Sequence, residues 1–274
     1  MRNVALLLLL TCSAPATPPT RTPAPAAPAR ATSAADFDIR IINGQVIDGT
    51  GRERYRADVG IRGDRVVEIG DLSKKSSAIT IDAKGQVVTP GFIDLLGHSE
   101  GSVLIDPHLE GKIRQGVTTE VTGEGHSPGP LDDAMTAEMN RTRPPGFPEV
   151  SWRTLADFMK VAEKRGSAIN FAFYIGAANP REIVIGGADR PPTAAELQRM
   201  TSIVDESMRA GAVGMSTALI YPPGRFATTE ELIAMSRVVS NTAAATGRTF
   251  ATKARTFFPH WMRPFASGAR GTCR

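Results

Sequence analysis

Residues 87–100 read VVTPGFIDLLGHSE. An apolar run follows Pro90 and ends at a histidine, His98. A short apolar run bounded by Pro and Gly is typical of a buried strand in a parallel sheet. A polar side chain directly after such a strand lies at its carboxyl end, where (β/α) enzymes place their sites. We therefore expect a barrel strand that leads into a site.

Strands and helices alternate along the rest of the chain. The sequence predicts strands at 88–96, 117–123, 168–177, 212–220 and 248–252. It predicts helices between them at 107–116, 151–166, 191–211 and 228–247, with a capping box formed by Thr193 and Glu196. This alternation favours an α/β fold, an incomplete (β/α)8 TIM-type barrel, because five strands fall short of the eight that a closed barrel needs.

The segment ahead of the barrel has a different pattern. Between residues 36 and 88, short alternating apolar runs are separated by Asn43-Gly44, Gly63-Asp64 and Lys84-Gly85. Such pairs are turn signals, so we expect antiparallel strands joined by tight turns. The domains are then an N-terminal β-sandwich portion at 36–88, five barrel strands at 89–252, and a tail at 253–274.

The first 35 residues predict export rather than a fold. An early Arg, a short apolar run and small residues (MRNVALLLLLTCSAPA) have the layout of a secretory signal peptide. A Pro/Ala-rich tether follows, from residue 13 to residue 35. We expect a periplasmic or extracellular protein, with a membrane contact only through a possible lipid anchor at Cys12.

The charge distribution argues against a nucleic-acid partner. The formal net charge of +4 arises from the two ends, which hold eight basic residues and no acidic ones. Residues 36–252 are therefore net acidic, and an acidic body does not provide a groove for phosphates.

Three motifs support a named resemblance. VVTPGFIDLLGHSE, RQGVTTEVTGEG and GAVGMSTALIYPPGRFATTEEL resemble the N-acyl-D-amino-acid deacylase (D-aminoacylase) branch of the amidohydrolase superfamily, over residues 37–252. The resemblance implies a barrel beside a small β-sandwich and a Zn2+ ion that activates water. It also implies hydrolysis of a non-peptide amide C–N bond in a small-molecule substrate, an N-acyl amino acid or a similar amide.

The metal ligands depart from the family pattern. Leu96 stands where the family has the first histidine of a pair, and His98 matches the second. The family's cysteine in GNCG falls within Gly123–His126, so we expect Glu124 to replace it, with His126 as the alternative.

Three further residues and one further stretch complete the expectations for the site. The resemblance places Ser216 and Tyr221 at the substrate, while His108 is expected on the surface. Where the family continues with THxR, this chain reads Thr252-Lys253-Ala254-Arg255.

The tail from residue 253 has no acid, no cap and no helical period. We therefore interpret 253–274 as an out-of-frame sequence, and expect the truncated chain to lack later ligands and to be inactive as written. The alternative is a non-catalytic barrel protein that has lost its metal ligands.

Overall fold

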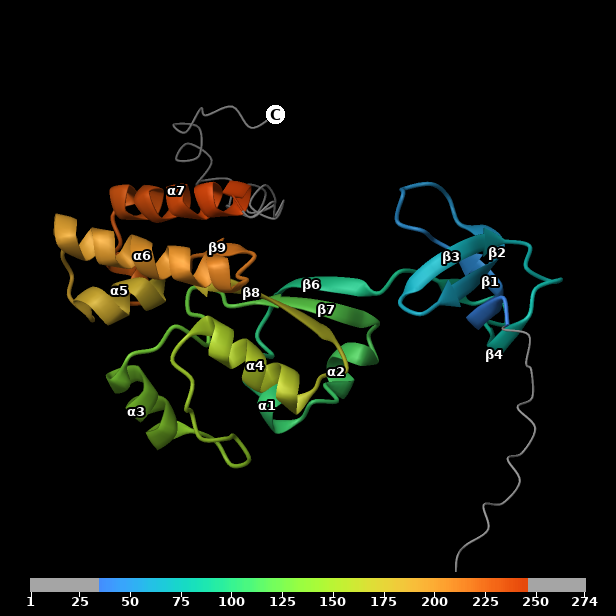
Figure 1. The fold of residues 1–274 in the computed structure, drawn as a ribbon, viewed down its shortest axis with the longest axis horizontal. Coiled ribbons are helices and arrows are strands. Elements are labelled where there is room, and N and C mark those ends of the chain that lie inside the picture. Colours follow the sequence, from blue (N-terminus) through green and yellow to red (C-terminus); the bar gives the residue numbers. More distant parts are fainter. Residues whose placement is uncertain (1–34, 246–274) are drawn as a thin grey trace, which may run out of the picture. The chain divides into compact units, whose positions relative to one another are not determined.

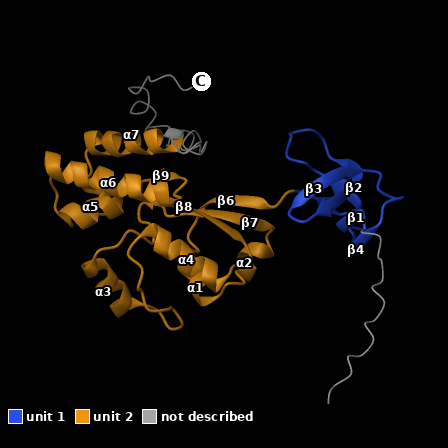
Figure 2. Cartoon of the chain, in the orientation of Figure 1, with its two compact units in different colours: residues 1–89 blue, residues 90–274 orange. Residues whose placement is uncertain are grey.

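The computed structural model describes residues 35–245. The chain divides into two compact units, the first ending at Thr89 and the second beginning at Pro90 (Figure 2). The predicted signal peptide, the tether, Cys12, the strand at 248–252 and the tail at 253–274 lie outside the described residues. Among residues 35–245, none of the helices has the length and apolar character needed to cross a membrane.

The first unit is a mixed sheet with the strand order β3-β2-β1-β4, and β5 pairs with β1. Its strands are β1 (Phe37–Val46), β2 (Tyr55–Arg62), β3 (Arg65–Gly70), β4 (Ser77–Asp82) and β5 (Val87–Val88). Pairs β1–β2 and β2–β3 are antiparallel, as expected. Pairs β1–β4 and β1–β5 are parallel, so the expectation of an antiparallel arrangement throughout was wrong.

The predicted turn at Asn43-Gly44 is a bulge inside β1. Asn43 adopts φ 59°, and the register with β2 shifts between Ile41 and Gly44 while the strand continues. The Asn43 side chain donates to the Asp82 carboxylate at 3.0 Å, and a Cβ on Gly44 would lie 2.7 Å from a Val88 methyl. The left-handed residue is therefore absorbed by the strand, because β4 and β5 pack closely beside it.

The second unit contains a curled parallel sheet in chain order, β6-β7-β8-β9. Its strands are β6 (Phe92–Gly97), β7 (Val117–Thr122), β8 (Asn170–Gly176) and β9 (Gly214–Ser216). All three pairings are parallel, so the carboxyl ends of the strands meet at one edge. This half barrel confirms the predicted fold class.

Helices connect the parallel strands, and α4, α6 and α7 lie side by side in that order (Figure 1). The helices are α1 (Ser102–Ile105), α2 (Glu110–Ile113), α3 (Asp133–Thr142), α4 (Leu155–Arg165), α5 (Ala178–Ile185), α6 (Ala194–Ala210) and α7 (Thr229–Ala245), with a 3-10 turn at Gly224–Phe226. The capping box of Thr193 and Glu196 is present at α6. Sequence patterns missed α1, α3 and α5. The helix expected at 107–116 is limited to α2, and the strand expected at 212–220 is limited to β9.

The core of the second unit lies between its sheet and its helices. Met200, Val204 and Met208 lie on the buried face of α6, spaced as the 3.6-residue period of a helix requires. They join a cluster of aromatic and aliphatic side chains from the other elements, including Trp152, Phe158, Phe173, Ile175, Met235 and Val239.

A fully buried ion pair fastens α7 to α5. Arg181 Nη1 lies 2.6 Å from Glu231 Oε2, and both side chains are 0% exposed. The Arg181 guanidinium also donates to the carbonyl oxygens of Ala188 and Arg190. Removing one partner of such a pair leaves an uncompensated charge in the core, so the two residues have to be tested together.

We expect Arg181→Met to lower the free energy of unfolding by ~3–5 kcal/mol, because the Glu231 carboxylate would stay buried without its cation. The double variant Arg181→Met/Glu231→Leu removes both charges and should recover most of that loss. Urea denaturation followed by circular dichroism measures both changes. A double variant no more stable than the single one would show that the pair is not the source of the loss.

Candidate functional site

The two predicted metal ligands meet at the carboxyl edge of the half barrel. His98 follows β6, Glu124 follows β7, and these strands are adjacent and parallel. His98 Nε2 lies 3.5 Å from Glu124 Oε2, with the two side chains 61% and 35% exposed. The structure therefore brings an imidazole and a carboxylate together where solvent and a small molecule can reach them.

The loop that holds Glu124 is fixed by Ser216 of β9. The Ser216 hydroxyl donates to the Gly123 carbonyl at 2.5 Å and accepts from the Gly125 amide at 3.1 Å. Gly125 adopts φ 68°, and a Cβ there would lie 2.6 Å from the Ala218 Cβ. A side chain at position 125 therefore has no room in this arrangement.

The β6 loop is fixed by a residue that the sequence patterns missed, Glu120 of β7. Its side chain is 0% exposed, and it accepts from the Ser99 amide at 2.7 Å and the Ser99 hydroxyl at 2.8 Å. Lys112 Nζ of α2 lies 3.0 Å from the same carboxylate. A charged residue inside the strand VTTEVT was the available signal, because a strand interior holds a carboxylate only when donors surround it.

Lys112 connects Glu120 to a second carboxylate, that of Asp94 in β6. The ammonium group lies 2.5 Å from Asp94 Oδ2. This hydrogen bond from Lys112 is the main reason why the pKa of Asp94 is lowered, and the same bond raises the pKa of Lys112. Both groups are therefore charged at neutral pH, and they tie α2 to the sheet below the His98 loop.

A cavity of about 750 Å³ lies beside the loops that hold His98 and Glu124, although neither of these two residues lines it. Glu100, two residues after His98, and His126, two residues after Glu124, line it. His126 Nε2 lies 3.1 Å from Glu182 Oε2 of α5, so His126 faces α5 rather than joining His98 and Glu124. The alternative ligand is thus placed in the wall of the cavity.

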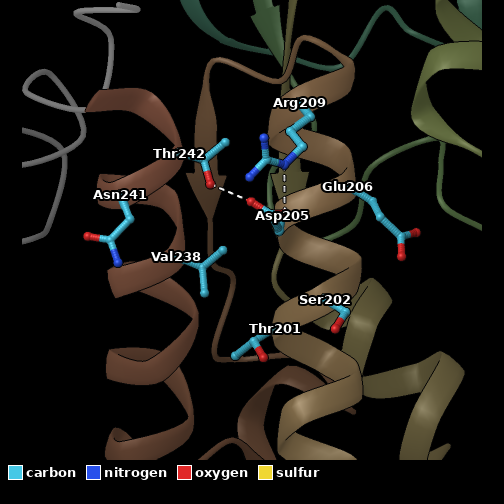
Figure 3. A pocket seen from close by; sticks show the side chains of 8 residues that line it. All are labelled: Thr201, Ser202, Asp205, Glu206, Arg209, Val238, Asn241 and Thr242. Carbon is cyan, nitrogen blue, oxygen red and sulfur yellow. Dashed lines mark hydrogen bonds and ion pairs between the residues drawn. The ribbon is translucent and has the colours of Figure 1, made fainter. Parts of the chain in front are cut away.

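A second cavity, of about 600 Å³, lies between α6 and α7 (Figure 3). At its centre, Asp205 accepts from Arg209 at 2.8 Å and from Thr242 at 2.5 Å. The Thr242 contact joins the two helices, the Arg209 contact lies within α6, and neither involves a predicted site residue. We therefore assign this cavity to helix packing.

Two of the described residues, the predicted ligands, have side chains of the kinds that bind zinc. His98 and Glu124 offer an imidazole nitrogen and a carboxylate oxygen, both accepted zinc donors. Within residues 35–245, His, Cys, Asp and Glu form no group of three that could hold a metal ion. A catalytic zinc has three protein ligands, so this donor set fits zinc in kind and falls short in number.

The structure also shows where the other residues named in the sequence analysis lie. Leu96 is 52% exposed on β6 and brings no donor, and the His108 side chain lies on the surface. Tyr221 is 61% exposed and lines neither cavity. The substrate-binding roles of Ser216 and Tyr221 stay predictions, although the Ser216 hydroxyl already holds the Glu124 loop.

We expect Gly97→Ala to lower the free energy of unfolding by ~1–3 kcal/mol, because its Cβ would lie 2.0 Å from the Glu120 side chain. Gly187→Ala is the matched control, since nothing lies within 4 Å of a Cβ there and the change should stay within ~0.5 kcal/mol. Urea denaturation compares the two. Equal stabilities would show that Glu120 is not held against β6.

Two proteins of known function are similar to this chain in sequence. The chain is 37% identical over 206 residues to D-aminoacylase of Alcaligenes xylosoxydans xylosoxydans, a match that covers 74% of this chain and 42% of that protein. It is 38% identical over 208 residues to N-acyl-D-glutamate deacylase of the same organism, with the same coverage of 74% and 42%. No family model matches the chain. The chain thus spans less than half the length of these relatives.

Solved structures give the same result. One is N-acyl-D-glutamate deacylase from Bordetella bronchiseptica, complexed with zinc and a phosphonate that mimics the tetrahedral intermediate. It is 36% identical with a TM-score of 0.66, over 75% of this chain and 43% of that chain. A D-aminoacylase structure that defines a subset of amidohydrolases is 36% identical with a TM-score of 0.68, over 76% and 44%. Over the matched part, the chain therefore belongs to the D-aminoacylase-like group of the amidohydrolase superfamily.

Proposed function

We propose that this protein hydrolyses a non-peptide amide C–N bond, in an N-acyl-D-amino acid or a similar small amide. The observation that supports the proposal best is the meeting of His98 and Glu124, 3.5 Å apart, at the carboxyl ends of adjacent parallel strands. That edge is where barrel enzymes perform their chemistry. The named relatives are deacylases of N-acyl-D-amino acids, which makes an amide the fitting substrate.

The described residues would hold and orient the reacting groups. Zinc, when bound, polarises an amide carbonyl and lowers the pKa of a water molecule. His98 and Glu124 would supply two of its ligands, and further donors would come from outside residues 35–245. Ser216 would keep the Glu124 loop in place, and Glu120 would do the same for the residue that follows His98.

A non-catalytic barrel protein is the second candidate, because the chain lacks two metal-ligating side chains of the family pattern, a histidine and a cysteine. Leu96 stands at the first histidine position of the family, and Gly125 stands in the loop that holds the family's cysteine. The packing of Gly125 against Ala218 shows that this loop is built around the absence of a side chain. Such a protein would keep the fold and lose the metal.

Amine release from N-acetyl-D-phenylalanine and its L enantiomer tests the proposed function. We expect the protein translated from the complete coding region, supplied with zinc, to hydrolyse the D form at least ~10-fold faster. His98→Ala should lower this rate by more than ~10-fold, because it removes a proposed ligand. The matched control is His108→Ala, which replaces an exposed histidine and should leave the rate unchanged.

The zinc content of the same preparation separates the two candidates. A hydrolase should retain close to one zinc per protein, while the second candidate should retain less than about a tenth of an equivalent after purification. Hydrolysis that persists in His98→Ala would contradict the assignment of the site. A protein that neither hydrolyses the substrate nor retains zinc would support the second candidate, a non-catalytic barrel protein.

A further inference from the structure

The cavity beside the His98–Glu124 pair has an apolar floor made by three buried side chains. Leu131, Trp152 and Phe158 are 7%, 2% and 1% exposed, and all three line the cavity of about 750 Å³. Trp152 and Phe158 meet edge to face, with ring centroids 5.3 Å apart. Trp152 Nε1 donates to the Pro128 carbonyl at 2.8 Å, so the ring presents no free donor to a ligand.

Other apolar side chains extend this floor into walls. Phe147 lies with its ring centroid 6.3 Å from that of Trp152, and Met135 and Met139 of α3 are partly buried against the same core. All three line the cavity. A pocket of this size with aromatic and thioether walls suits a ring or a branched alkyl group, since methionine adapts to irregular shapes.

The polar lining of the cavity is acidic. Four carboxylates line it, and its lining contains neither Lys nor Arg: Glu100, Asp132, Glu138 and Glu182. His126 is the single basic group in the lining, and it lies 3.1 Å from Glu182. A cavity lined by one sign of charge attracts a ligand of the opposite sign.

Local partners leave most of this negative charge in place. Glu138 is paired with the exposed Arg141 at 2.6 Å. Asp132 caps α3 by accepting from the Met135 amide, and Glu100 accepts from the Thr122 hydroxyl, so neither carboxylate is neutralised by a cation in those contacts. A carboxylate ligand would therefore be repelled, while an ammonium group would meet carboxylates at the rim and aromatic faces at the floor.

We propose that this cavity binds the apolar part of a positively charged small molecule, of the aralkylammonium class. This binding goes beyond the proposed function, because an aralkylammonium ion has no acyl group to hydrolyse, although Glu100 and His126 connect the cavity to the His98 and Glu124 loops. Binding itself does not require hydrolysis.

Three probes that share a phenyl ring and differ in charge test the proposal. They are 2-phenylethylammonium, 2-phenylethanol and 3-phenylpropionate, titrated into the full chain by calorimetry at low ionic strength and then at ~1 M salt. We expect the cation to bind at least ~10-fold more tightly than the alcohol and the anion to bind most weakly, with the difference shrinking in salt. Equal affinity for cation and anion, or no binding of any probe, would overturn the proposal.

A pair of charge variants on α3 locates the binding. Ala134 lines the cavity and is exposed, so Ala134→Arg adds a positive charge to the lining without disturbing the core. Ala137 is exposed on the same helix and does not line the cavity, which makes Ala137→Arg the matched control. We expect Ala134→Arg to abolish the preference for the cation and Ala137→Arg to keep it. A preference that changes equally in both variants would overturn the assignment to this cavity.

Failure of this inference and failure of the proposed function give different results. Cation-selective binding without amide hydrolysis would contradict the proposed function alone. Hydrolysis of N-acetyl-D-phenylalanine with equal binding of the charged probes would contradict the cavity assignment alone.

Discussion

A carboxylate that is completely buried within a strand has to find donors, and the Glu120 carboxylate takes them from the loop that follows the neighbouring strand. The Ser99 amide and hydroxyl bind it at 2.7 and 2.8 Å, and Lys112 lies 3.0 Å away. The close approach is possible because β6 has Gly97 at the point of contact. This one group therefore sets the path of the chain at Ser99, directly after His98 and directly before Glu100.

The loop that follows β7 is also held in place, by hydrogen bonds to Ser216 and by close packing. Ser216 binds the Gly123 carbonyl and the Gly125 amide, and Gly125 packs against Ala218 without space for a side chain. The carboxylate of Glu124 is consequently held on the loop beside His98, instead of the thiolate that the family pattern places there. The two proposed ligands are thus an imidazole and a carboxylate, and an acidic cavity with an aromatic floor lies next to their loops.

The sequence predicted the elements that local patterns determine. The apolar runs of β7 and β8, the period of α6 and its capping box of Thr193 and Glu196 all follow from side chains near in sequence. The predicted pair of His98 and Glu124 was also found together, because parallel strands bring their carboxyl ends to one edge.

What the sequence did not predict depends on contacts between distant residues. Asn43-Gly44 has the pattern of a turn, and only the neighbouring strands turn it into a bulge within β1. Helix α3 starts at the cap Asp132 inside a Pro- and Gly-rich stretch that is typical of a loop. The cavity lining is drawn from the β6 and β7 loops, α3, α4 and α5, so its acidic character was invisible in any single motif.

The central claim is that the chemistry takes place between the ends of β6 and β7. Diffraction measured at the zinc absorption edge, on zinc-grown crystals of the same protein that is used for the amide assay, checks that claim. The account predicts an anomalous peak between the imidazole of His98 and the carboxylate of Glu124, which lie 3.5 Å apart. A peak on other side chains, with none between these two, would contradict it.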